Sequence, residues 1–97
     1  MNATLNVYED CTSDKPIKTY TCKRLLLKVS IKVQALSEKI NGKSAAEQQE
    51  LMIDILKTIF PNFEDADFDG LDPSEYKAFI AEIGKETALI QGKTLKN

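Results

Sequence analysis

The segment most able to bind a metal ion is Asp65-Ala-Asp-Phe-Asp-Gly-Leu-Asp-Pro-Ser-Glu75. Carboxylates stand at its first, third and fifth positions and a glycine at its sixth, which is the opening pattern of a calcium loop of the EF-hand type. However, Glu75 stands at the eleventh position, whereas such a loop takes its bidentate glutamate from the twelfth. We therefore prefer an acidic corner between two helices, with no metal bound. The alternative is a small calcium-binding module that uses Asp65, Asp67, Asp69 and Glu75.

Catalytic side chains are scarce elsewhere. The chain has no histidine, which removes the usual general base and the commonest metal ligand, and only two cysteines, too few for a zinc site built from cysteine alone. No pair of carboxylates lies in an apolar setting that would suit acid–base catalysis. We expect no catalytic residue, no cofactor and no enzymatic activity.

The elements that position these residues must fit in one small domain, because the chain has 97 residues. The net charge is −2, but it is unevenly distributed. Residues 14–43 carry eight Lys or Arg against two acids, whereas residues 44–86 carry three Lys against eleven acids. This polarity favours self-association of unlike patches, or else describes two solvated faces that have no partner.

Two other classes of partner are not expected. The N-terminus has no basic segment followed by an apolar one, and no apolar run approaches the ~20 residues that span a bilayer, so we expect no signal peptide and no membrane. The basic stretch Lys23–Lys32 contains no aromatic residue and belongs to an acidic chain, so we expect no nucleic acid.

The N-terminal residues 1–22 predict a β-hairpin. Thr4–Glu9 and Ile17–Cys22 alternate in side-chain character on either side of a turn-rich segment. A hairpin centred on that turn would place Cys11 opposite Pro16 and Cys22 opposite Leu5, so we expect two unpaired thiols.

Residues 23–91 predict a helical body. Within Lys23–Ile40, residues 27–35 alternate between apolar and polar side chains, as a strand would. However, five apolar residues fall at helical spacing, and Asn41-Gly42 is a suitable helix end, so we expect a helix. The five residues are Leu25, Val29, Val33, Leu36 and Ile40. Ser44 and Glu47 form a capping-box pattern before a helix that ends at Phe60-Pro61. Asn62 could cap a single turn, and Asp72-Pro73 opens the final helix. The fold class is mainly α, a small helical domain of three to four helices with a short N-terminal β-hairpin and a frayed tail at 92–97.

The helices carry more apolar side chains than one short chain easily covers. Leu25, Leu26 and Leu27 lie in succession, for example. Part of this surface is therefore expected to bind another protein, by a helix-in-groove mode. The candidate contact residues, not separated at this point into core and interface, are Leu51, Ile55, Ile59, Phe79, Ile83 and Ile90.

The order of elements resembles the tail assembly chaperones of long-tailed (siphovirus-type) phages of Gram-positive bacteria. The likeness extends from about Thr19 to Glu86. Its most telling pieces are Thr21-Cys-Lys-Arg-Leu-Leu-Leu-Lys28 leading into Leu36-Ser-Glu-Lys39, and Asp69-Gly-Leu-Asp72 before the last helix.

The resemblance implies a non-enzymatic role in the host cytoplasm. Such proteins coat the helical tape measure protein, keep it soluble, help to recruit the tail tube protein and are absent from the mature virion. Many are also made in a longer, frameshifted form. The implied partners are therefore the tape measure protein, the tail tube protein and further copies of the chain itself.

Overall fold

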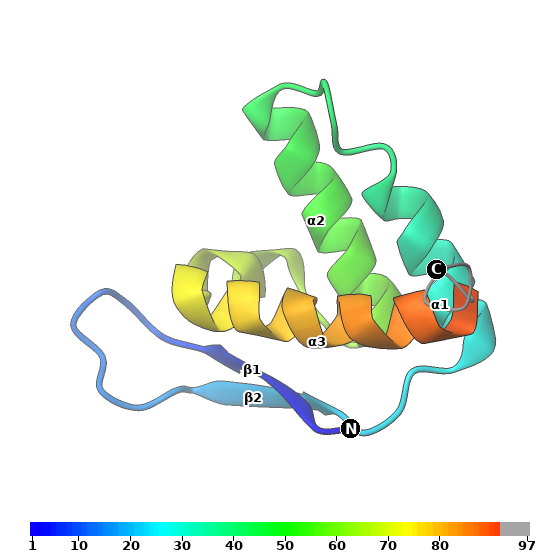
Figure 1. Ribbon diagram of the computed structural model, residues 1–97. Coiled ribbons are helices and arrows are strands. Elements are labelled where there is room, and N and C mark those ends of the chain that lie inside the picture. Colours follow the sequence, from blue (N-terminus) through cyan, green and yellow to red (C-terminus); the bar gives the residue numbers. More distant parts are fainter. Residues whose placement is uncertain (92–97) are drawn as a thin grey trace.

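The computed structural model describes residues 1–91, with side chains as far as residue 88 (Figure 1). Within this range the chain forms a two-stranded hairpin, three α-helices and one short 3-10 helix, in the order β1 (Ala3–Val7), β2 (Lys18–Cys22), α1 (Leu27–Ser37), α2 (Ala45–Ile59), η1 (Asp65–Gly70) and α3 (Pro73–Gln91). The predicted mainly α fold with an N-terminal hairpin is confirmed. The tail expected at 92–97 lies outside the described residues.

The two strands are antiparallel, and their register differs from the predicted one. Cys22 pairs with Ala3, and Leu5 pairs with Tyr20. The expectation that Cys22 faces Leu5 and Cys11 faces Pro16 is therefore wrong by two residues. The physical reason is that β1 stops at Val7 and the loop takes up residues 8–17. Both cysteines are unpaired, as expected; Cys11 is exposed and Cys22 is buried.

The hairpin is held by the segment that precedes α3. Val7 forms an isolated antiparallel bridge with Leu71, and the Tyr8 backbone N–H donates to the Gly70 carbonyl at 2.7 Å. A Cβ on Gly70 would collide with the Tyr8 carbonyl oxygen and the Val7 side chain, so only glycine allows this approach. Val7, the last residue of β1, is therefore held between Lys18 of β2 and Leu71.

Helix α1 confirms the helical interpretation of residues 23–40 but is shorter than expected. It begins at Leu27 because Leu26 is extended, with ψ of 148°, and its last helical residue is Ser37. Gly42, with φ of +81°, lies in the following loop rather than at the helix end. The predicted helical stripe is confirmed for Val29, Val33 and Leu36; Leu25 and Ile40 also pack against the core but lie outside α1.

Local signals for the other helices are mostly confirmed. The Ser44 side chain accepts a hydrogen bond from the Glu47 backbone and the Glu47 side chain accepts one from the Ser44 backbone, which begins α2. The Asp72 carboxylate accepts from the backbone N–H groups of Ser74 and Glu75, which begins α3. The expected cap at Asn62 is wrong, because η1 begins later, after Glu64.

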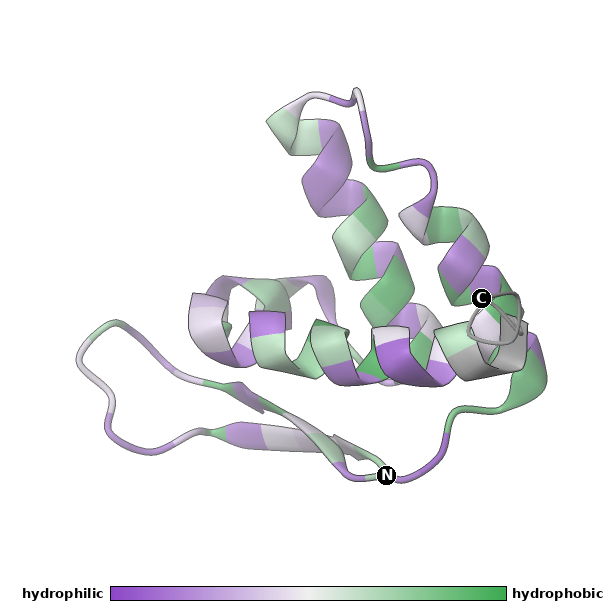
Figure 2. Ribbon diagram, in the orientation of Figure 1, coloured by the Kyte–Doolittle hydropathy of each residue, from purple (hydrophilic) through white to green (hydrophobic). Residues whose placement is uncertain are grey.

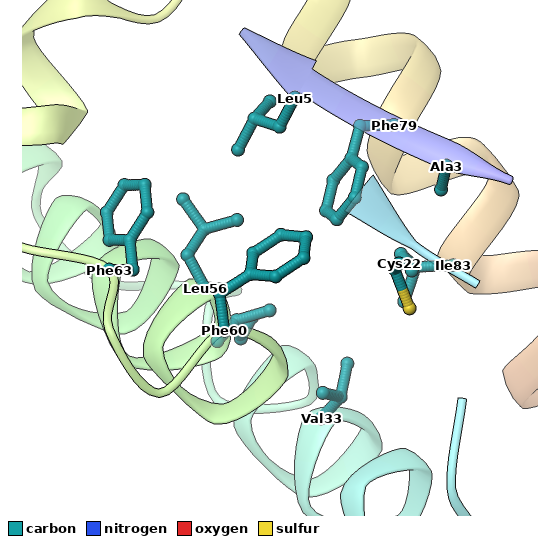
Figure 3. Close-up of a cluster of buried hydrophobic side chains, with 10 residues drawn as sticks. Ala3, Leu5, Cys22, Val33, Leu56, Phe60, Phe63, Phe79 and Ile83 are labelled. Carbon is teal, nitrogen blue, oxygen red and sulfur yellow. The ribbon is translucent and has the colours of Figure 1, made fainter. Parts of the chain in front are cut away.

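The core lies where the hairpin and all three α-helices meet (Figure 3). Helix α3 contacts both β1 and α1. Leu5, Leu56 and Phe79 are almost fully inaccessible, and each contributes roughly 1.5–3 kcal/mol by burial. Figure 3 shows their side chains converging with others from β2, α1 and α2. A row of aromatic rings adds to the packing. The ring centroids of Tyr20 and Phe60 lie 5.1 Å apart, and those of Phe60 and Phe79 lie 5.6 Å apart.

One polar atom in this core lacks a partner. The Ser30 hydroxyl on α1 is fully buried and makes no hydrogen bond to any described residue. We expect Ser30→Ala to stabilise the protein by about 1 kcal/mol, because it removes an unsatisfied hydroxyl and introduces a better helix former. Urea unfolding measures the change. A loss of stability would show that the hydroxyl has a partner.

Candidate functional site

The acidic segment 65–75 does not form a metal cage. The Asp65 carboxylate pairs with Lys57, and Glu75 accepts hydrogen bonds from the Tyr8 hydroxyl at 2.8 Å and the Asn6 amide at 3.3 Å. Asp67 points instead toward β2. Among the described residues, no group of three or more His, Cys, Asp or Glu side chains could hold a metal ion. The segment is built as a corner that attaches the hairpin.

Asp67 is the buried member of this corner, with its side chain 6% exposed. Its carboxylate accepts hydrogen bonds from the Tyr20 hydroxyl at 2.6 Å, the Lys18 ammonium at 3.0 Å and the Glu64 backbone N–H at 3.0 Å. Burial by itself would raise the pKa of Asp67, but the hydrogen bonds from Tyr20, Glu64 and Lys18 outweigh it and lower that pKa below 3.8. The ionised carboxylate therefore joins β2 to η1.

The candidate contact residues divide between core and surface. Ile55, Phe79 and Ile83 are 2–3% exposed and belong to the core. Leu51 and Ile59 on α2 are half-buried, and Ile59 packs against the core. The side chain of Ile90 lies outside the described residues. The prediction left core and interface unseparated, and the structure places these three residues on the core side; whether any of the six contacts a partner stays a prediction.

The exposed apolar residues lie mainly on α1 and just before it. Leu26 is 61% exposed, Leu27 59% and Ile31 54%. We call these three residues the α1 strip. The side chains of Lys23, Arg24, Lys28 and Lys32 beside them are also exposed. Figure 2 shows the start of α1 as a hydrophobic segment next to hydrophilic ones.

Part of this strip was visible in the sequence. The alternation of Leu27 and Ile31 with lysines, which competes with the helical spacing, marks a second apolar face of α1. Val29 and Val33 face the core, whereas Leu27 and Ile31, four residues apart, share the outer side. A surface helix normally has only one apolar face, so the outer face needs a further explanation.

A groove of about 270 Å³ lies between α1 and α3. Ile40, Ile80, Tyr76 and the edges of Ile55 and Ile83 line it, with Gly84 at its rim. Burial raises the pKa of Tyr76 to about 12, so its hydroxyl stays neutral at physiological pH. The groove is smaller than the roughly 300–1,000 Å³ typical of small-molecule pockets, which suits side chains of a partner better than a separate ligand.

A larger, acidic cleft of about 490 Å³ lies between the hairpin loop and the start of α3. Its carboxylates are Asp10, Asp14, Asp69 and Asp72, and no Lys or Arg lines it. Asp10 folds the loop by accepting hydrogen bonds from Thr12, whose side chain and backbone donors lower the pKa of Asp10. Asp10 therefore stays ionised at neutral pH.

We expect Asp67→Asn to destabilise the protein by about 2–3 kcal/mol at pH 7, because it removes the charge that Tyr20 and Lys18 bind. The folded pKa of Asp67 is depressed, so its contribution is present above the unfolded pKa of about 3.9 and is lost as pH falls through the folded value. Urea unfolding at pH 7 and at lower pH should show that the difference in the free energy of unfolding between the wild type and Asp67→Asn becomes smaller as the pH falls. Asp69→Asn, an exposed carboxylate on the same segment, is the control and should change little. Equal destabilisation by Asp67→Asn and Asp69→Asn would contradict the role of Asp67 in joining β2 to η1.

Substitution by an acidic residue should affect the core and the α1 strip differently. Phe79→Asp should unfold the chain, since it removes about 3–5 kcal/mol of packing and buries a charge. Leu27→Asp should keep the fold, because the side chain is exposed and an acid in the first helical turn is favourable. Circular dichroism distinguishes the two results. A folded Phe79→Asp variant would show that the core is misassigned.

Among residues 1–91, no helix is long and apolar enough to cross a membrane. The chain matches no known protein-family model, no curated protein and no solved structure.

Proposed function

We propose that this protein is a phage tail assembly chaperone that binds and solubilises the helical tape measure protein during tail morphogenesis and that self-associates. It acts without catalysis, in the host cytoplasm, and is absent from the mature virion. The tail tube protein is its further partner. The resemblance carried by residues 19–86 supports this function.

The observation that carries the proposal is the apolar groove between α1 and α3. Its walls are mainly aliphatic and aromatic, with Gln34, Ser37 and Thr87 as the polar members, and they come mainly from α1 and α3, with Ile55 from α2. An apolar groove between helices is the kind of surface that a helix-in-groove site requires. Apolar side chains at helical spacing on a tape measure segment would bind in this groove, where they are removed from water. Each aliphatic side chain that becomes fully buried contributes roughly 1.5–3 kcal/mol, so many copies along one long helix can keep it soluble.

The calcium alternative gains no support from the geometry. Asp65, Asp67 and Glu75 have protein partners on three different elements: Lys57 on α2, Lys18 and Tyr20 on β2, and Tyr8 beyond β1. Calcium would have to displace these contacts before it could gather the carboxylates. We therefore retain a single candidate function.

Gly84 offers a direct test of the groove. A Cβ at this position meets no atom within 4 Å, so a side chain can begin here in open space. We expect Gly84→Leu to fill the groove and abolish solubilisation of the tape measure protein while the chain stays folded. The assay co-expresses the chaperone with the tape measure protein encoded by the same phage and measures the soluble fraction, with the tape measure protein expressed alone as the insoluble reference.

Gly84→Ala is the matched control. It removes the flexible glycine from α3 and should stabilise the protein by about 1 kcal/mol while leaving the groove open. It should solubilise the tape measure protein as well as the wild type does. Equal activity of Gly84→Leu would contradict the groove assignment. Failure of the wild type, and of any longer frameshifted product, to solubilise the tape measure protein would contradict the function itself.

A further inference from the structure

The molecule has two chemically unlike ends. It measures 45 × 31 × 23 Å. In Figure 1 the hairpin loop and the start of α3 lie at one end, at the left, and the start of α1 lies at the other, at the right. The acidic cleft belongs to the first end and the α1 strip to the second.

The α1 end is apolar and basic. Leu26, Leu27 and Ile31 are more than half exposed, and no acidic residue occurs anywhere between residues 15 and 37. An apolar face that stays in water on a chain of this size favours association with another surface. The cations beside it require that surface to be acidic.

The opposite end has the complementary chemistry. Asp14 and Asp69 project into the cleft without a hydrogen bond or ion pair to any described residue, whereas Asp10 and Asp72 are held by the loop and by α3. Leu71 and Pro73 contribute apolar surface to the cleft. Ile17, which is 61% exposed, adds an apolar side chain where the same loop joins β2.

We infer that copies of this protein join head to tail, with the α1 strip of one copy docked against the acidic cleft and hairpin loop of the next. This inference deepens the self-association in the proposed function by naming the two surfaces that meet. A two-fold contact of strip with strip is disfavoured, because it would bring Lys28 and Lys32 against their own copies. A contact between unlike ends pairs opposite charges at every junction.

The charged groups at both surfaces are solvent-exposed, so their attraction is screened by salt over a distance of about 10 Å at 0.1 M. The apolar side chains bury area that salt does not screen. We therefore expect association that rises with protein concentration, weakens as salt is added, and requires both the apolar and the charged residues.

Two variants block one end each. Leu27→Gln with Ile31→Gln removes the two apolar side chains of the strip that lie on α1, keeps the neighbouring cations and preserves helix propensity. Asp14→Lys with Asp69→Lys reverses the cleft and spares Asp10 and Asp72, whose hydrogen bonds hold the loop and begin α3. Circular dichroism confirms the fold of each variant, and sedimentation velocity measures the oligomeric state of the full chain at low and at moderate salt.

The wild type should form salt-sensitive oligomers, and each variant alone should be monomeric. An equimolar mixture of the two should form dimers and stop there. The intact strip of the cleft variant meets the intact cleft of the strip variant, whereas the two altered ends repel one another. A mixture that stays monomeric would overturn the inference, as would a wild type that is monomeric at its highest soluble concentration.

Persistence of oligomers in the cleft variant alone would also overturn it, because this is the behaviour of a strip-to-strip dimer. Both variants leave the groove between α1 and α3 unaltered. Loss of self-association with retained solubilisation of the tape measure protein would therefore separate the two surfaces. Failure of the tape measure assay with intact, salt-sensitive oligomers would count against the proposed function and leave the head-to-tail contact standing.

Discussion

The ionised carboxylate of Asp67 fixes the hairpin on the helices, and the closed core depends on that attachment. A two-stranded hairpin is marginal in water by itself. Here Lys18 and Tyr20 on β2 donate to Asp67, while the Tyr20 ring packs on Phe60 and Phe63. With β2 held in this way, Leu5 on β1 is placed over Phe79 and Leu56 (Figure 3). One buried charge thus orients the apolar surface that stabilises the fold.

Sequence patterns predicted the elements well where the signal is local. The capping box at Ser44, the Asp72 cap and the stop at Phe60-Pro61 each depend on neighbouring residues, and each is present in the structure. The hairpin register and the late start of α1 were not predictable from such signals. Tyr8 leaves the strand for Gly70, a contact between residues far apart in the chain, and Leu26 is extended without any side-chain cap.

The candidate sites show the same division between local and non-local information. Spacing alone placed Asp65, Asp67 and Glu75 in one acidic segment, but only the fold assigns each carboxylate to a different partner. Helical periodicity found the apolar residues of α2 and α3 but could not say which of their faces the other elements cover. Phe79 and Ile83 on α3 become core beside β1, and Ile55 on α2 becomes core beside α1. The α1 strip stays exposed because α2 and α3 cover only the opposite side of α1.

The unlike ends of the molecule have a consequence for any row that copies form through them. Such a row has a direction, since its first and last members expose different chemistry: an apolar, basic terminus at one extremity and an acidic terminus at the other. A protein that recognises only one of these termini would bind once per row, whatever the number of copies in it. A head-to-tail contact can repeat without limit, because each added copy exposes the same free end as the one before it. The number of copies is therefore set either by closure of the row into a ring or by the length of the molecule along which the copies lie.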